Sequence, residues 1–343
     1  MTFDPRNILV IDFGQLGDVV MSLPALRAIR ERFPNARIAV AVGKPAGGVI
    51  EMTNYADSII SVDRVSLRDG FQPLSILRML QLVKDVRRGQ FDFVIDLHSF
   101  RETNLLAFLS GAPQRLFSRR PGRSLDFLGN FNPKPPIDQN NPKQHLIDRY
   151  LDVLTPLGIR DSPREPKLTT RLEDDRAVDM MLRKARADAG SPLVGLFPGA
   201  GHPGRCWPVE SFAQLAEYLI RNDKVRPIIF VGPEERHKLP EIRALFPPPC
   251  IILDKLSIPQ LAATQARLAV FVSNDTGPVH IAAAVGTPLV VLIDVPAPHA
   301  YLPLGTSQRL MFSQRVTAIE VEDVYIATRQ LLSAGRTASL FAS

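Results

Sequence analysis

The sequence predicts an α/β protein with two halves, each built on a parallel β-sheet whose two faces are covered by helices. Short continuous runs of apolar residues, typical of buried parallel strands, alternate along the chain with amphipathic helical patterns. A stretch rich in proline, glycine and arginine interrupts this alternation between about residues 115 and 141. The length of 343 residues also fits two domains.

In the first half, the hydrophobic periodicity predicts three strands and three helices. The strands are expected at residues 7–12, 37–42 and 91–97. The helices are expected from near residue 18 to near residue 33, at 76–88 and at 144–157, and residues 158–169 read as a linker.

The second half repeats the pattern after a polar helix at residues 173–189. Its strands are expected at 193–197, 227–231, 250–253, 268–273 and 289–293, and further helices at 210–221, 234–245, 258–266 and 321–332. We therefore predict an N-terminal domain at 1–165, a C-terminal domain at 166–320, and a C-terminal helix within 321–343 that can pack back on the first domain.

Composition and charge exclude several classes of protein. Two cysteines, Cys206 and Cys250, are too few for a disulfide framework or a four-ligand zinc site and favour a cytosolic protein. The chain starts without a signal-peptide pattern, and its longest nearly apolar run, residues 281–293, is shorter than the roughly 20 residues of a membrane span. A net charge of +6 suits an anionic ligand or an anionic membrane face. No series of aromatic residues indicates nucleic-acid binding.

The turn after the first strand, residues 13–18, contains two glycines and one carboxylate. Gly14 and Gly17 allow a substrate to approach the backbone closely, and Asp18 stands at the start of a helix. The spacing matches neither a dinucleotide-binding G-x-G-x-x-G loop nor a Walker A loop, which argues against a nicotinamide oxidoreductase. Asp18 is therefore a candidate catalytic carboxylate or an ordinary helix cap.

Two segments of the second half can meet an anion. Residues 197–208 place three glycines, Arg205 and the single tryptophan between a strand and a helix; the alternative is a surface loop with Trp207 in the core. Residues 273–280 end a strand and open a helix, with Pro278 at an early position. Amide groups at such a helix start can bind a diphosphate, although an ordinary capped helix has the same pattern.

The segment after the third strand supplies basic groups to the first half. Residues 96–101 end with Arg101, and a loop at 119–123 adds three arginines that can hold an acidic acceptor or form a solvated charged surface. His98 and His145 lack the spacing of metal ligands, so no metal site is predicted.

These segments, in this order, resemble the pattern of glycosyltransferase family 9, which includes ADP-heptose:lipopolysaccharide heptosyltransferases. They read ILVIDFGQLGDVVMSLPALRAIRERF (8–33), FDFVIDLHSFR (91–101), FPGAGHPGRCWP (197–208) and NDTGPVHIAAAVGTP (274–288). The resemblance implies a GT-B fold, in which two Rossmann-like domains with parallel sheets face a central cleft. The acceptor is then expected on the first domain and the nucleotide-sugar donor on the second.

The resemblance also implies roles for individual residues. Asp18 is expected to act as general base in an inverting transfer, and Arg205 to stabilise the leaving diphosphate in place of a tightly bound metal. The implied donor-binding residues are Ala200, Gly201, Arg205, Glu234, Leu256, Asp275, Thr276, Gly277, Pro278 and His280. Among them, Glu234 is expected at the nucleoside ribose, Leu256 in the base pocket and His280 at the donor sugar or phosphate. The implied acceptor-binding residues are Gly17, Arg101 and His145.

Four positions depart from the family pattern. Arg205 stands where the family usually has lysine, which keeps the charge but changes the geometry. Ala200 and Gly201 replace residues that usually include serine or threonine, so they offer only backbone donors. Asp294 stands where many members have glycine, which bears on the choice of donor sugar.

The expected function is transfer of a heptose or similar sugar from an ADP-sugar to a lipopolysaccharide core or related glycan. We expect no cofactor, a cytoplasmic location and peripheral contact with an anionic membrane. Two alternatives remain at this point: a catalytically inactive nucleotide-sugar-binding relative, and a sugar-nucleotide epimerase or hydrolase of the same architecture.

Overall fold

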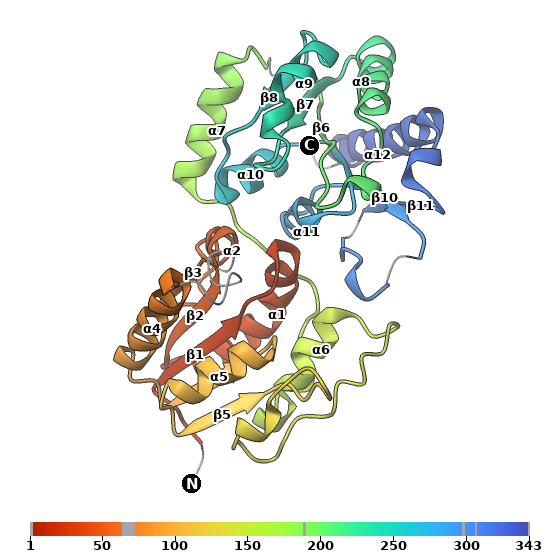
Figure 1. The fold of residues 1–343 in the computed structure, drawn as a ribbon. Coiled ribbons are helices and arrows are strands. Elements are labelled where there is room, and N and C mark those ends of the chain that lie inside the picture. The colour runs from red at the N-terminus through yellow and green to blue at the C-terminus, as the bar shows by residue number, and fades with distance from the viewer. Residues whose placement is uncertain (1–2, 64–72, 188–189, 297–298, 306, 342–343) are drawn as a thin grey trace. The chain divides into compact units, whose positions relative to one another are not determined.

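The computed structural model describes residues 3–63, 73–187, 190–296, 299–305 and 307–341, and the chain divides into two compact units (Figure 1). Unit 1 comprises Met1–Pro166 and Pro298–Leu302, and unit 2 comprises Lys167–Ala297 and Pro303–Ser343. The boundary between Pro166 and Lys167 adjoins the predicted one. The short segment Pro298–Leu302, which the sequence analysis placed in the second domain, groups with unit 1.

Unit 1 is built on a five-stranded parallel sheet of order β3-β2-β1-β4-β5. Its strands are β1 (Asn7–Asp12), β2 (Arg37–Gly43), β3 (Ser58–Val62), β4 (Phe93–Asp96) and β5 (Gln114–Phe117). The central strands are those that the apolar runs predicted, and Ile8 of β1 pairs with Ile38 on one side and Phe93 on the other. The edge strands β3 and β5 escaped prediction because both are short and carry polar residues within the strand.

Helices cover both faces of this sheet. On one face, α4 (Pro73–Arg88) and α5 (Arg101–Leu109) pack through Val86 and Leu106 against Leu9 and Val94. The helix α1 (Leu16–Arg32) lies on the other face. The ring of Phe33, which follows α1, approaches the ring of Phe93 to 6.5 Å, and the side chain of Phe93 points to the opposite face of β4 from that of its neighbour Val94. The helix α6 (Leu146–Val153) contacts α1. A short helix, α2 (Lys44–Ile50), follows β2.

Unit 2 is built on a six-stranded parallel sheet of order β11-β10-β9-β6-β7-β8. The strands are β6 (Leu193–Phe197), β7 (Arg226–Phe230), β8 (Ile251–Leu253), β9 (Val270–Asn274), β10 (Leu289–Asp294) and β11 (Gln308–Ser313). The helices are α7 (Leu172–Lys184), α8 (Val209–Asp223), α9 (Leu239–Leu245), α10 (Ile258–Gln265), α11 (Gly277–Ala284) and α12 (Val321–Phe341). The helix predicted at 234–245 is shorter, since Pro240 in the first turn of α9 cannot continue a helix from the preceding residues.

The C-terminal helix α12 belongs to unit 2. Val324, Tyr325 and Leu331 are buried in the same apolar cluster as Leu215 of α8 and Val272 of β9. This packing differs from the expectation that the helix returns to the first domain. The physical reason is that α12 carries an apolar stripe which one face of the unit 2 sheet accommodates directly.

The carboxyl group of Asp96, at the end of β4, is buried in unit 1. Burial raises its pKa from 3.8 to about 6, although contacts with Thr103, Ser99, His98 and Asn104 act in the opposite direction. Its oxygens accept hydrogen bonds from the Ser99 amide at 2.7 Å and the Asn104 side chain at 2.8 Å. The folded protein therefore holds a proton on Asp96 over a pH range in which the unfolded chain has released it.

This difference predicts a pH dependence of stability. Asp96 favours the folded state at acidic pH, and that contribution is lost as the pH rises from the unfolded pKa of 3.8 through the folded pKa of about 6. Between about pH 4 and pH 7, the free energy of unfolding of the wild type should fall by about 2–3 kcal/mol more than that of Asp96→Asn. Urea unfolding of both proteins measures the difference, and parallel pH profiles would contradict it.

Candidate active-site residues

Each parallel sheet has a point at which the strand order reverses, so that the strands before and after it extend the sheet toward opposite edges. In unit 1 it lies between β1 and β4, and in unit 2 between β6 and β9. Ligands of open α/β sheets bind beyond the carboxyl ends of the strands at such points. The strand ends there are Asp12 and Asp96 in unit 1, and Phe197 and Asn274 in unit 2.

Asp12 is fully buried and carries the contacts that shape the unit 1 site. Its Oδ1 accepts a hydrogen bond from the Gly14 amide at 2.9 Å and lies 3.3 Å from Nδ1 of His98. Burial acts to raise the pKa of Asp12, but the hydrogen bonds and charge of its neighbours, above all His98, hold it below 3.8. Asp12 therefore remains a carboxylate inside the protein.

The turn after β1 links Asp12 to Asp18. A Cβ atom on Gly14 would lie 2.4 Å from Cβ of Asp18 and 2.9 Å from Oδ1 of Asp12, so only glycine fits between the two side chains. Oδ2 of Asp18 accepts a hydrogen bond from the Gln15 amide at 2.8 Å, completing a capping box at the start of α1. Asp18 thus takes part in capping α1 as its third residue, whereas the N-cap residue itself is Gln15, and Gly17 is buried in the same helical turn.

The cap does not remove Asp18 from the site, because its side chain also lines a pocket of about 230 Å³ in unit 1. Basic and aromatic side chains form much of the wall. They include His98, Arg120, Arg123, Arg149, Tyr150 and Tyr301. Tyr301 comes from the segment Pro298–Leu302, about 150 residues after Tyr150 in the sequence.

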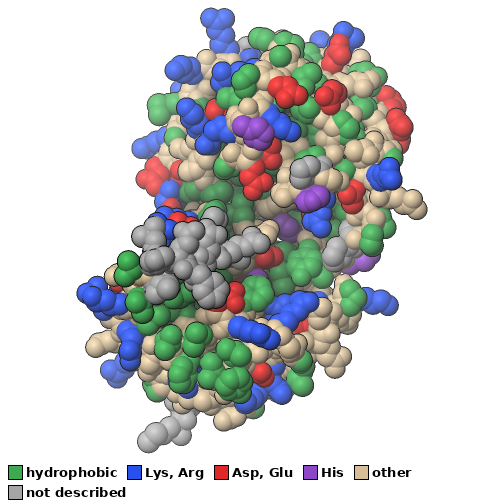
Figure 2. Space-filling view, viewed as in Figure 1, with side chains coloured by type: hydrophobic (Ala, Val, Ile, Leu, Met, Phe, Trp, Pro, Cys, Tyr) green, Lys and Arg blue, Asp and Glu red, His purple; other side chains and the backbone are tan. Residues whose placement is uncertain are grey.

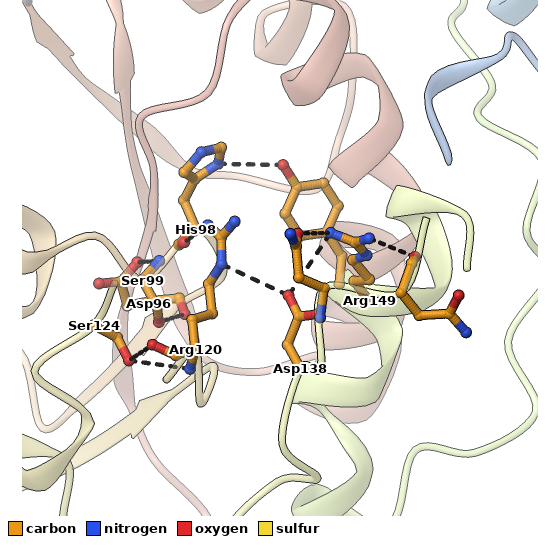
Figure 3. Close-up of polar contacts among 10 residues, drawn as sticks. Asp96, His98, Ser99, Arg120, Ser124, Asp138 and Arg149 are labelled. Atoms are coloured by element: carbon orange, nitrogen blue, oxygen red, sulfur yellow. Dashed lines mark hydrogen bonds and ion pairs between the residues drawn. The ribbon is translucent and has the colours of Figure 1, made fainter. Parts of the chain in front are cut away.

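Arg120 and Arg149 both lie near the carboxylate of Asp138 in the wall of the pocket (Figure 3). Arg120 donates a hydrogen bond to the His98 carbonyl at 2.9 Å and lies 3.6 Å from Asp138. Arg149 lies 3.9 Å from the same carboxylate, and Arg123 is exposed. The 119–123 loop is therefore more than a solvated charged surface, since Arg120 is half-buried against the pocket.

Tyr150 and His98 form the inner wall. The Tyr150 hydroxyl lies 3.3 Å from Nδ1 of His98, the atom that also faces Asp12 (Figure 3). Burial, together with the negative charges of Asp12 and Asp18, raises the pKa of Tyr150 well above 10. Tyr150 is therefore an uncharged phenol that can donate a hydrogen bond.

Two predicted acceptor residues lie elsewhere in unit 1. The Arg101 side chain is exposed at the start of α5 and donates a hydrogen bond to the Gly122 carbonyl at 3.1 Å. His145 caps α6: its Nδ1 accepts from the Ile147 amide, and its Nε2 lies 2.8 Å from the Leu302 carbonyl. Both ring nitrogens of His145 thus have structural partners, and acceptor binding by these two residues stays a prediction that the geometry does not favour.

In unit 2, Asn274 at the end of β9 fixes both ends of the loop that follows β6. Its Oδ1 accepts from the Trp207 amide at 2.9 Å, and its Nδ2 donates to the carbonyls of Pro198 at 2.9 Å and Gly199 at 3.2 Å. Trp207 is buried in the core, as one interpretation of the sequence held, and its indole donates to the Ile319 carbonyl at 2.9 Å. The loop ends are anchored, and the Arg205 side chain between them is exposed.

The start of α11 is close enough to this loop for the charge of Arg205 to act on Asp275. Thr276 is the N-cap residue, and no side-chain hydrogen bond caps the helix there. Burial raises the pKa of Asp275, and the charge of Arg205 opposes the rise. His280 is buried within α11. The arrangement suits an anion near the first amides of the helix, with Arg205 as the neighbouring cation.

The carboxylate held against this loop is Glu235, one residue from the predicted Glu234. A Cβ atom on Gly199 would lie 2.5 Å from Cδ of Glu235, and one on Gly232 would lie 2.6 Å from its Oε2. Burial raises the pKa of Glu235, whereas the Glu234 side chain is exposed. Leu256, predicted to line a base pocket, is half-buried after β8.

Other predicted features have structural contacts of their own. The carboxylate of Asp294 accepts a hydrogen bond from the Val316 amide and so joins the end of β10 to the 3-10 turn Val316–Ala318, which follows β11. In the part of the chain that the structure describes, no group of three or more His, Cys, Asp or Glu residues is arranged to hold a metal ion. No helix among the described residues has the length and apolar character needed to cross a membrane.

Comparison with known proteins identifies the family. The family described as glycosyltransferase family 9 (heptosyltransferase) matches residues 79–327, well over half of the chain. The chain belongs to glycosyltransferase family 9. It is a glycosyltransferase, and the predicted GT-B fold with two Rossmann-like units is confirmed.

Similar proteins cover nearly the whole chain. Lipopolysaccharide heptosyltransferase 2 of Salmonella typhimurium is 25% identical over 316 residues, covering 89% of this chain and 87% of that protein. The solved family 9 structure from Veillonella parvula has a TM-score of 0.84 at 24% identity and covers 97% of this chain and 99% of its own. The Escherichia coli heptosyltransferase WaaC, solved with ADP, has a TM-score of 0.75 at 18% identity and covers 95% and 99%.

The anchoring of the unit 2 loop can be tested with Asn274→Ala. This change leaves the buried Trp207 amide without its acceptor and releases the 198–199 end of the loop, so we expect a loss of about 1–3 kcal/mol in the free energy of unfolding. Gln214→Ala removes an exposed side chain of unit 2 and should change stability by less than about 0.5 kcal/mol. Equal free energies of unfolding for the two variants would contradict the anchoring of this loop by Asn274.

Proposed function

We propose that this enzyme is an inverting heptosyltransferase that moves a heptose from ADP-heptose to a lipopolysaccharide core acceptor, with Asp18 as general base. The observation that carries the proposal is the position of Asp18 in the wall of a pocket whose other side chains include Arg120 and Arg123. A carboxylate beside cations suits an acceptor that brings both a reactive hydroxyl and an anionic group. The similarity to lipopolysaccharide heptosyltransferase 2 supports the choice of substrates.

The acceptor would bind to unit 1. Guanidinium groups recognise carboxylates and phosphates through paired, charge-assisted hydrogen bonds. Arg120 is held in place by the His98 carbonyl and by Asp138, so its orientation is set before the acceptor arrives. The neutral Tyr150 phenol offers a hydrogen bond to a sugar hydroxyl without adding charge.

The chemical step would be a single displacement. Asp18 takes the proton of the acceptor hydroxyl while that oxygen forms a bond to the anomeric carbon of the heptose. The bond from this carbon to the β-phosphate oxygen of ADP breaks, and ADP leaves with the electron pair. Attack from the face opposite the leaving group inverts the configuration. A positioned general base contributes about 10²- to 10⁴-fold to the rate.

The donor would bind to unit 2. Arg205 and the amide groups of Thr276 and Gly277 at the start of α11, where Pro278 follows without an N–H of its own, would stabilise the growing charge on the diphosphate. Ala200 and Gly201 lie in the same loop and would contribute backbone groups.

Residues near the neighbouring strand ends would contact the ribose, the base and the donor sugar. Glu234 was expected at the ribose, and Glu235 is the better placed carboxylate because it packs against Gly199 and Gly232. Leu256 and His280 remain proposed contacts to the base and to the donor sugar or phosphate. The proposal includes no cofactor and no tightly bound metal, and it places the enzyme in the cytoplasm.

The test is transfer from ADP-heptose to lipopolysaccharide that lacks its heptoses, followed by mass spectrometry of the product and NMR of the new linkage. The wild type should form an inverted linkage, and ADP should stabilise the protein against heat more than UDP or GDP does. In Asp18→Asn the turnover number should fall by about 10²- to 10⁴-fold with ADP binding unchanged, because the variant lacks the base but keeps unit 2 intact.

The matched control is Asp85→Asn, the same substitution on the exposed face of α4, which should keep wild-type turnover. Full activity of Asp18→Asn would remove Asp18 from the role of base. Preferential stabilisation by UDP or GDP would instead overturn the assignment of the donor.

A further inference from the structure

One face of unit 1 exposes an apolar patch, which we define as Leu77 and Leu80 of α4, Leu105 and Phe108 of α5, and Phe127. These side chains are between 46% and 73% exposed. Phe127 lies in a short 3-10 helix, Asp126–Leu128, that contacts α5. A cluster of large apolar side chains exposed to solvent indicates an interaction site.

The fold brings the members of the apolar patch together. Leu105 and Phe108 are three residues apart on α5, and Leu109, also partly exposed, adds a third apolar side chain to the same side. The opposite side of α5 is buried against the sheet through Leu106. Because α5 already packs one apolar side against the sheet, packing in the core does not account for the apolar residues on its outer side.

Basic side chains border the apolar patch. The exposed outer face of α4 continues from Leu80 to Lys84, Arg87 and Arg88, against the single acidic residue Asp85. The guanidinium of Arg115 lies 5.4 Å from the centre of the Phe108 ring. Figure 2 shows hydrophobic side chains gathered over α5 with lysine and arginine side chains towards the edge formed by α4.

The apolar patch also adjoins the loop that supplies Arg120 and Arg123 to the pocket. Arg101, at the start of α5, donates a hydrogen bond to the Gly122 carbonyl of this loop at 3.1 Å. The Leu125 amide, between the loop and Phe127, donates to Oδ1 of Asn104 in α5 at 2.7 Å. A surface that engages the apolar patch is therefore next to the pocket in which Asp18 lies.

We propose that the apolar patch and its basic border dock unit 1 on the surface of an anionic lipid bilayer. Leucine and phenylalanine side chains enter the boundary between headgroups and acyl chains, and lysine and arginine pair with anionic headgroups. A second copy of this chain would bring the basic borders of two patches together, so the charge favours lipid over self-association. The purpose of docking rests on the proposed function, since a lipid-anchored acceptor would then be presented beside its pocket.

Unit 2 offers a matched control surface. Leu172 and Met180 of α7 are as exposed as the members of the apolar patch, but they lie eight residues apart and form no cluster with another large exposed apolar side chain of α7 among the described residues. Two separate apolar side chains bury too little surface to dock on a membrane.

The test is co-sedimentation of the full chain with vesicles of phosphatidylglycerol and phosphatidylcholine, and with vesicles of phosphatidylcholine alone. The wild type should bind the anionic vesicles, release them at high salt, and ignore the neutral ones. Leu105→Ser/Phe108→Ser and Leu77→Ser/Leu80→Ser should each weaken the partition coefficient about tenfold or more. Leu172→Ser/Met180→Ser should bind like the wild type.

The outcomes separate this inference from the proposed function, because the vesicles contain no acceptor and binding requires no turnover. Thermal unfolding confirms that each variant is folded. Wild-type binding by both patch variants, or equal binding to neutral vesicles, would overturn the inference. A dimer of the wild type that Leu105→Ser/Phe108→Ser converts to monomer, without any change in vesicle binding, would assign the apolar patch to a second copy instead.

Discussion

The unit 1 site depends on one buried charge, the carboxylate of Asp12. An ionised group without solvent is costly unless neighbours supply hydrogen bonds or opposite charge. At the end of β1 these come from the Gly14 amide and the His98 ring. Meeting that requirement holds the turn after β1 against α1, with Gly14 packed between Asp12 and Asp18, and it places His98 where it can also meet Tyr150.

In unit 2 the loop next to the strand end is held by a neutral side chain. Asn274 occupies the strand end next to the strand-order reversal, as Asp12 does in unit 1, and its amide ties both ends of the neighbouring loop to the sheet. An amide can donate and accept at once, which suits a loop that presents one amide and two carbonyls. It also adds no negative charge near the proposed diphosphate. The two sites therefore share a construction while differing in charge.

Much of this could be predicted from the sequence, because continuous apolar runs and helical periodicity are strong signals in parallel α/β sheets. The central strands of both units, the helix after Asp18, and the loop and helix start around Arg205 and Pro278 lie where the patterns indicated. The edge strands β3, β5 and β11 were missed because they bury too little apolar surface to form an uninterrupted run.

The contacts between distant residues could not be predicted. Nothing in the spacing links Tyr150 or Tyr301 to Asp18, since each reaches the pocket only through the packing of a different segment. Asp12 offered a signal, a charged residue closing an apolar strand, but its role depends on His98 some 86 residues later. Nor does the sequence tell which of the adjacent side chains of Glu234 and Glu235 turns toward Gly199.

The geometry predicts that Asp12 acts on turnover by holding in position the turn that carries Asp18. The most direct test is a double-mutant cycle on transfer, with Asp12→Asn, Asp18→Asn and the combination, each shown to be folded by thermal unfolding. If Asp12 acts through Asp18, Asp12→Asn will lower kcat strongly in the wild type and hardly at all in the Asp18→Asn background. Gly14→Ala, which perturbs the same contact, should behave in the same way. Losses from Asp12→Asn and Asp18→Asn that simply add in the double variant would contradict the account.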